Sequence, residues 1–224
     1  MTTTLDSSNL TLEDVYQLLK LDRRLNNSIS SLLTLEPISE TESHKLHQIR
    51  DNFDSYYNWG TISEGEVKFM TISPLLWLAN FYPYSTSRIT LEEKIASINI
   101  EDEDTIIKGR MDILAIHKVK AREISTPFCI LVLETKRSSV AALKGLPQLL
   151  TYAYKCLDHQ EWVWGLTTNG MEYQFIRIEQ GNPPIYQQFP PLNLIYPESS
   201  IQILQVLKAI GKLYQSDRTS NNPT

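Results

Sequence analysis

One stretch decides the fold that this sequence predicts: FCILVLETK, at residues 128–136. Its first six residues form an uninterrupted apolar run, which is typical of a strand buried on both faces of a sheet. The run continues into Glu134-Thr135-Lys136, and because strand side chains alternate between faces, Glu134 and Lys136 share one face. A buried strand that carries two charges at its carboxyl end either leaves the core there or reaches a functional site.

A second strand, predicted within residues 106–116, carries Asp112 among apolar residues. If the two strands pair as a hairpin with its loop at roughly 117–127, Asp112 falls opposite Glu134. The same register places apolar partners opposite each other, Leu114 with Val132 and Ile116 with Ile130. Two carboxylates that face each other across a ladder, about 5 Å apart at Cβ, repel unless a positive charge lies between them.

The rest of the chain predicts helices and strands in mixed order. Helices are expected from the capping-box patterns at Thr11 and Ser39, at 63–80 with a kink at Pro74 or a restart capped by Ser73, at 147–157, and from 200 to about 214. Strands are expected at 96–100, 162–168, 172–178 and 185–189, with an acidic turn at 101–104 and a tight turn at Asn169-Gly170. This order predicts an α/β fold with a mixed sheet flanked by helices. We expect an N-terminal helical layer at 1–60, a core at 61–215 and a disordered tail at 216–224.

Composition narrows the class of protein. The chain has 224 residues, a formal net charge of −5 and a pI near 5.4, which argues against a simple cationic coat for nucleic acid. Hydrophobic residues make up 42%, enough to build a core. The start, MTTTLDSSNL, has no secretory pattern, and the longest apolar run is far shorter than the roughly 20 residues that cross a bilayer. We therefore expect a soluble, cytoplasmic protein with no membrane partner.

Charge is unevenly distributed along the chain. Between Thr105 and Lys155 there are nine basic and three acidic residues, which gives this stretch +6 and leaves −11 for the remainder. A basic segment inside an acidic protein can still attract a phosphate backbone locally.

The two cysteines fit neither a disulfide framework nor a paired-cysteine zinc site. Cys129 belongs to the apolar run, and Cys156 lies late in a predicted helix. Both are therefore predicted to be buried thiols.

Asp112 and Glu134 are oxygen ligands of the kind that Mg²⁺ prefers, since this ion is commonly held by one or two carboxylates while it keeps waters and phosphate oxygens. Such a site can hydrolyse phosphodiesters, with Lys136 placed to orient water or to meet developing negative charge. The alternative is that both carboxylates simply pair with Lys136 or Arg110 at the rim of the sheet.

The triplet Glu-x-Lys is unspecific by itself. Glu66-Val67-Lys68 and Glu92-Glu93-Lys94 also satisfy it. Only Glu134-Thr135-Lys136 ends a predicted buried strand, so this copy is the candidate for chemistry.

Several short motifs follow one another in a characteristic order: Glu64, Lys68 and Pro74-Leu75-Leu76; Lys108-Gly109-Arg110-Met111-Asp112; Pro127 through Arg137; Gln148 through Tyr152; and Thr168-Asn169-Gly170. Together they resemble the PD-(D/E)xK nuclease superfamily, specifically the N-terminal nuclease domain of type I restriction enzyme R subunits and its stand-alone relatives. The resemblance covers roughly residues 60–178, and Met111 stands where the superfamily name has proline.

The resemblance implies a restriction-endonuclease-like fold and a metal-dependent endonuclease that cleaves DNA, with Mg²⁺ as cofactor and Mn²⁺ as a substitute. Asp112 and Glu134 would ligate the metal, and the early helix would add a further acid, Glu64 or alternatively Glu66. Lys136 would assist the attacking water, and Gln148 would position water or substrate. Residues expected to contact DNA are Arg110, Arg137, Lys144 and Tyr152.

Taken only as residues, Glu64 also fits an acid at a helix N-terminus, and Gln148 a solvated helix position. DNA is the expected partner, and a second copy or other restriction-system subunits are the expected assembly partners. A different class of function stays open, in which a catalytically silent nucleic-acid-binding or assembly module keeps the same fold. The acidic net charge favours that alternative, whereas the pair of facing acids favours the enzyme.

Overall fold

The computed structural model describes residues 3–82, 87–94, 97–100, 104–117 and 128–213. Four predicted features fall wholly or largely outside this range: Ala96 in its predicted strand, the acidic turn at 101–104, the hairpin loop at 117–127 and the tail at 216–224. Within the described residues, no helix is long and apolar enough to cross a membrane.

A mixed sheet of eight strands forms the centre of the molecule. Its order is β2 (Asp22–Leu25), β10 (Ile185–Gln188), β9 (Glu172–Glu179), β8 (Trp162–Thr168), β7 (Cys129–Thr135), β6 (Arg110–His117) and β3 (Ser87–Lys94), with β11 (Leu192–Asn193) beside β9. Strand β7 pairs antiparallel with β6 and parallel with β8, and every one of its residues is buried. The predicted mixed α/β fold with a central buried strand is confirmed.

Three short strands form a second sheet, in the order β1 (Thr3–Asp6), β5 (Thr105–Lys108) and β4 (Ile98–Ile100). The predicted N-terminal helical layer holds α1 (Leu12–Leu19) and α2 (Glu40–Trp59), but it also contains two strands that were not predicted, β1 in this small sheet and β2 at the edge of the large one. The single strand predicted at 106–116 is divided at Gly109 into β5 and β6, which belong to different sheets.

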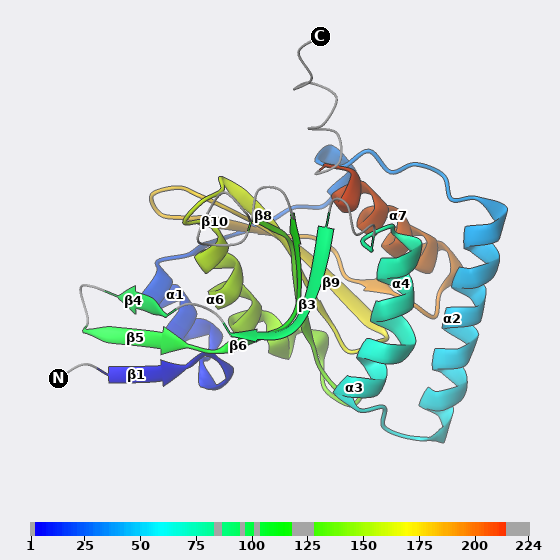
Figure 1. The fold of residues 1–224 in the computed structure, drawn as a ribbon, viewed down its shortest axis with the longest axis horizontal. Helices are drawn as coiled ribbons and strands as arrows, with labels where there is room; N and C mark the ends of the chain where they lie inside the picture. Colours follow the sequence, from blue (N-terminus) through cyan, green and yellow to red (C-terminus); the bar gives the residue numbers. More distant parts are fainter. Residues whose placement is uncertain (1–2, 83–86, 95–96, 101–103, 118–127, 214–224) are drawn as a thin grey trace, which may run out of the picture.

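Helices cover both faces of the large sheet (Figure 1). Helices α1 (Leu12–Leu19) and α6 (Leu146–Cys156) pack on one face around Leu114 and Val132. The opposite face, around Leu131 and Leu133, is covered by α2 (Glu40–Trp59), α3 (Glu64–Val67), α4 (Ser73–Leu78) and α7 (Pro197–Leu213). This arrangement buries β7 between two hydrophobic layers. Short 3₁₀ turns occur at Ser7–Asn9, Ile29–Ser31 and Ala142–Gly145.

Capping boxes begin three of the helices. At the starts of α1, α2 and α3, a hydroxyl side chain accepts a hydrogen bond from the backbone N–H three residues on, and the acid there accepts one in return. The pairs are Thr11 with Asp14, Ser39 with Glu42 and Ser63 with Glu66. The predicted helix starts at Thr11 and Ser39 are therefore confirmed.

A π-helical turn, Lys68–Ile72, connects α3 to α4 just before Pro74. Proline lacks the N–H that would continue the ladder of helical hydrogen bonds, and a widened turn is one way to accommodate it. Ser73 is the first residue of α4, not its cap, and its hydroxyl contacts the Tyr82 hydroxyl at 3.1 Å.

The β6–β7 register agrees with the predicted hairpin at one end and shifts at the other. Leu114 pairs with Val132 as predicted, and Ile113 pairs with Leu133. Between Ala115 and Ile116 the register shifts, so Ile116 pairs with Cys129 instead of Ile130. A β-bulge inserts an extra residue in one strand, which alternation alone does not indicate.

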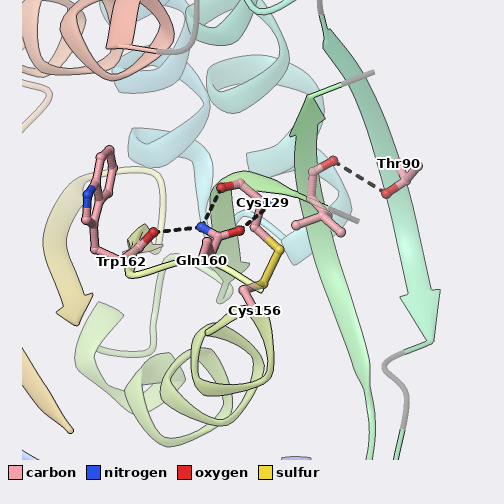
Figure 2. Close-up of a disulfide and its surroundings, with 6 residues drawn as sticks. Thr90, Cys129, Cys156, Gln160 and Trp162 are labelled. Atoms are coloured by element: carbon pink, nitrogen blue, oxygen red, sulfur yellow. Dashed lines mark hydrogen bonds between the residues drawn. A yellow bond between two sulfur atoms is a disulfide. The ribbon is translucent and has the colours of Figure 1, made fainter. Parts of the chain in front are cut away.

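The two cysteines are joined in a disulfide, Cys129–Cys156, which corrects the prediction of free thiols (Figure 2). They are buried as predicted, but the packing of α6 on β7 brings their Cα atoms to 6.1 Å. Gln160 fixes the same end of β7: its side chain accepts from the Cys129 N–H at 2.8 Å and donates to the Cys129 carbonyl at 3.0 Å. The strand that carries Glu134 is thus tied covalently to α6.

Reduction of this disulfide is expected to destabilise the fold. The bond joins residues 27 apart in sequence, and restricting the unfolded chain over that length is worth about 3–4 kcal/mol. Urea denaturation of oxidised wild type should give a free energy of unfolding that falls by about this amount when dithiothreitol is added. The double variant Cys129→Ala/Cys156→Ala should not respond to dithiothreitol. Two titratable thiols in denatured, unreduced wild type would contradict the bond.

Candidate active site

The acids Asp112 and Glu134 lie on neighbouring strands and on the same face of the sheet. The pairing of Ile113 with Leu133, continued by one residue, brings Asp112 opposite Glu134. Alternation turns both side chains toward the layer of α6, and Asp112 is 8% and Glu134 1% exposed. The central feature predicted from sequence, two facing carboxylates, is therefore present in the geometry.

Each carboxylate has its own lysine. The Lys136 ammonium donates to Glu134 Oε1 at 2.6 Å, and the Lys68 ammonium donates to Asp112 Oδ1 at 2.7 Å. The other Asp112 oxygen accepts hydrogen bonds from the Thr135 backbone N–H at 2.7 Å and from its hydroxyl at 2.6 Å. Asp112 is thus fixed between two elements, and its ion-pair partner is Lys68 instead of Arg110.

Glu134 is the least satisfied charge in the site. Burial, and after it the charge of Asp112, raise the pKa of its carboxyl to about 8, although Lys136 acts in the opposite direction. Its Oε2 atom is buried and has no hydrogen-bond partner within the described residues, and the same is true of the hydroxyl of Thr167, its neighbour on β8. A buried carboxylate oxygen without a partner is costly, and a cation or an ordered water there would relieve that cost.

The structure distinguishes the two candidate acids of the early helix. Glu66 is committed to the start of α3, where its carboxylate accepts from the Ser63 N–H at 2.8 Å and from the Ser63 hydroxyl at 2.7 Å. Glu64 is exposed and makes no such cap, and its charge is one of those that raise the pKa of Glu134. Of the two acids, Glu64 is therefore the one whose charge acts on Glu134.

Gln148 and Tyr152 lie one turn apart on α6 and belong to a hydrogen-bond network. The Gln148 amide group donates to the Tyr152 hydroxyl at 2.7 Å, and its carbonyl oxygen accepts from Lys136 at 3.4 Å. The Tyr152 hydroxyl contacts the Arg110 carbonyl at 2.5 Å, the Arg110 N–H at 3.2 Å and the Ser7 hydroxyl at 3.0 Å. The network links the lysine beside Glu134 to the start of β6 and to the N-terminal segment.

Two glycines allow close packing around the site. A Cβ atom at Gly145, at the start of α6, would come within 2.8 Å of Glu134 Cγ. A Cβ atom at Gly109 would come within 1.9 Å of the Ser7 hydroxyl oxygen. Any other residue at Gly145 or Gly109 would therefore have to displace the side chain of Glu134 or Ser7, respectively.

A cleft of about 550 Å³ opens beside Asp112. It is lined by Asp6, Ser8, Glu92, Lys94, Ser97, Lys108, Gly109, Arg110, Asp112, Gln148 and Tyr152. Three sequence-predicted residues besides Asp112 thus share this cleft: Arg110, Gln148 and Tyr152. Arg137, just after β7, and Lys144, just before Gly145, are exposed and do not line this cleft.

Several residues near the carboxylates were given no role from the sequence. Lys68 bridges Asp112 and Glu92, whose carboxylate accepts from the Lys68 ammonium at 2.8 Å. Glu92 has a φ of 52°, which is uncommon for a residue other than glycine. Thr135 donates hydrogen bonds to Asp112, and the Ser7 hydroxyl contacts that of Tyr152. Lys68 is part of the motif order in the sequence, but its contact with Asp112 is seen only in the folded structure.

The residues present fit a hard divalent cation. Within the described residues, no three His, Cys, Asp or Glu side chains gather closely enough to hold a metal ion by themselves. Two carboxylates, one with an unpartnered oxygen, match an ion such as Mg²⁺, which takes few protein ligands and keeps waters and phosphate oxygens in its remaining positions.

No protein-family model matches this chain, and no curated protein matches its sequence.

The buried carboxyl of Glu134 predicts a pH-dependent stability. The unfolded chain ionises this group near its ordinary pKa of 4.5 and the folded chain near about 8, so between these values the folded state binds more protons. The free energy of unfolding should therefore fall as pH rises from 5 to 9 in EDTA, by up to a few kcal/mol from this group. Glu134→Gln cannot ionise, so it should show a flatter profile and gain stability relative to wild type as pH rises.

The matched control is Glu161→Gln, which removes an exposed carboxylate at the far end of β8. It should keep the wild-type dependence of stability on pH in urea denaturation. Parallel profiles for wild type and Glu134→Gln would show that this carboxyl ionises normally.

Proposed function

We propose that this chain is a metal-dependent endonuclease of restriction-enzyme type, which hydrolyses DNA phosphodiester bonds. The observation that carries the proposal is the buried Glu134, with one unpartnered oxygen and a raised pKa, opposite Asp112 on the next strand. Groups with strongly perturbed pKa values beside a cleft are characteristic of functional sites. The resemblance of the motif order to PD-(D/E)xK nucleases supports DNA as the substrate.

Asp112 and Glu134 would hold Mg²⁺, or Mn²⁺ in its place, and Glu64 would add negative charge from α3. When bound, such an ion polarises a phosphate oxygen and lowers the pKa of a coordinated water. Asp112 is already oriented for this role by the two hydrogen bonds from Thr135. Lys68 neutralises Asp112 in the structure described here and would have Glu92 as its remaining partner once a cation binds.

Lys136 would act on the phosphate and the attacking water. Its ammonium lies between Glu134 and Gln148, so it offers a donor beside the carboxylate pair. A fixed positive charge there stabilises the negative charge that develops on the phosphate in the transition state. Gln148 holds Lys136 through its carbonyl oxygen, and its amide group is anchored by Tyr152, so Tyr152 serves as a positioning residue.

DNA is the proposed partner, with Arg110, Arg137 and Lys144 as exposed basic residues around the site. A second copy of the chain or other restriction-system subunits are the proposed assembly partners. A cytoplasmic location remains part of the proposal, although the Cys129–Cys156 disulfide is of a kind more common in oxidising compartments.

Cleavage of supercoiled plasmid DNA tests this function directly. Wild type with Mg²⁺ or Mn²⁺ should nick or linearise the plasmid, and EDTA should abolish cleavage. Asp112→Asn, Glu134→Gln and Lys136→Met should each slow cleavage by at least about 100-fold, because each removes a group that acts on the reacting phosphate. The control Glu161→Gln should cleave at the wild-type rate.

Calorimetry with Mn²⁺ separates the enzyme from a catalytically silent module. Wild type should bind the ion, whereas Asp112→Asn and Glu134→Gln should lose most of that affinity, and Lys136→Met should retain it. Absence of Mn²⁺ binding in wild type, or equal cleavage by wild type and Glu134→Gln, would refute the proposal. DNA binding without Mn²⁺ binding would favour the silent module.

A further inference from the structure

Two cations face each other at the edge of the cleft. Lys94, at the end of β3, is the cross-strand partner of Arg110, at the start of β6. Directly opposed residues in an antiparallel pair have Cβ atoms about 5 Å apart, and like charges at that separation are destabilising. Both side chains are exposed, and both line the cleft that contains Asp112.

A third cation, Lys108, lies on β5 two residues before Arg110 and lines the same cleft. Within the described residues, no ion pair is formed by any of these three side chains: Lys94, Lys108 and Arg110. The cleft therefore presents three cations that the described part of the chain leaves unneutralised.

The acids of the cleft are engaged elsewhere. Asp112 and Glu92 share the Lys68 ammonium, at 2.7 and 2.8 Å. Asp6, the register partner of Lys108, instead accepts hydrogen bonds from the Ser8 N–H at 2.9 Å and the Ser8 hydroxyl at 2.6 Å. None of these three acids forms an ion pair with Lys94, Lys108 or Arg110, which leaves the positive charge of those cations available to a ligand.

Arg110 is held in place for binding. Its backbone N–H and carbonyl both contact the Tyr152 hydroxyl, at 3.2 and 2.5 Å. Ser7 contacts the same hydroxyl and packs against Gly109, so the break between β5 and β6 is fixed. A cation on a fixed backbone loses less conformational entropy when it binds an anion.

From these observations we infer that Lys94, Lys108 and Arg110 form a binding site for the sugar-phosphate backbone of a nucleic acid, adjoining the carboxylate pair. An anion between Lys94 and Arg110 converts their repulsion into attraction. A chain of phosphates suits three cations distributed over two sheets better than a single small anion does. The identity of the polymer as DNA rests on the proposed function, whereas the site for a polyanion rests on the cleft alone.

Anisotropy of a fluorescein-labelled DNA duplex tests the site without cleavage. Binding is measured in Ca²⁺ on the Asp112→Asn protein, over a series of salt concentrations. Adding Lys94→Ala and Lys108→Ala should weaken binding by at least about 10-fold at low salt and reduce the slope of log K against log salt by about 2. Lys94→Arg, which keeps the charge, should retain binding.

The control is Arg24→Ala with Lys45→Ala in the same background, which removes the same charge from exposed positions on β2 and α2, outside the cleft. It should bind the duplex nearly as the parent does. Equal weakening by both pairs of substitutions, or no binding by the parent, overturns the inference. Melting temperatures without DNA check folding, and removal of the opposed charge should not lower them.

Inorganic phosphate distinguishes a backbone site from a small-anion site. Titrated alone, it should bind much more weakly than the duplex, and binding of phosphate without binding of duplex overturns the assignment. Wild-type protein that binds the duplex through Lys94 and Lys108 but cleaves no plasmid would support the site and contradict the proposed nuclease activity.

Discussion

A carboxylate removed from water loses several kcal/mol of solvation unless the protein replaces it. Glu134 is only 1% exposed, at the end of a strand whose other residues are buried between two hydrophobic layers. Its surroundings offer one ammonium, that of Lys136, and a second negative charge, that of Asp112. The fold therefore maintains a group that is unfavourable in its ionised form. Such a group adds little to the stability of the fold, and buried groups of this kind are typical of sites for binding or chemistry.

The geometry around that carboxylate depends on segments far apart in the sequence. The N-terminal Ser7 holds Tyr152, Tyr152 holds Gln148 and the Arg110 backbone, and Gln148 reaches Lys136. At the other end of β7, the disulfide and Gln160 fix the strand against α6. Glu134 and Gln148 therefore sit on two elements that are locked at both ends, which is what a site needs if its groups are to stay within a fraction of an ångström of their working positions.

The sequence was most informative where local and global signals agree. The apolar run of β7, the capping boxes at Thr11 and Ser39 and the turn at Asn169-Gly170 each specify structure over a few residues, and the elements lie where these signals predict. The strands and contacts that the sequence did not predict depend on residues far away in the chain. Strands β1 and β2 are short and largely exposed, and they are strands only because β5 and β10 pair with them from about 100 or more residues away. The Cys129–Cys156 bond and the contact of Lys68 with Asp112 likewise follow from how helices pack on the sheet.

Net charge illustrates the same limit for function. A value of −5 argues against binding to a polyanion only if the charges act together, yet charges further apart than a Debye length of about 8–10 Å are largely screened from one another. In the cleft, Lys68 pairs with Asp112 and Glu92, and Ser8 donates a hydrogen bond to Asp6. The cations Lys94, Lys108 and Arg110 form no ion pair among the described residues. The field that an approaching phosphate meets is set by that local arrangement. An acidic protein can therefore present a cationic path to a pair of carboxylates, provided that its other acids lie beyond the reach of the ligand or already have partners.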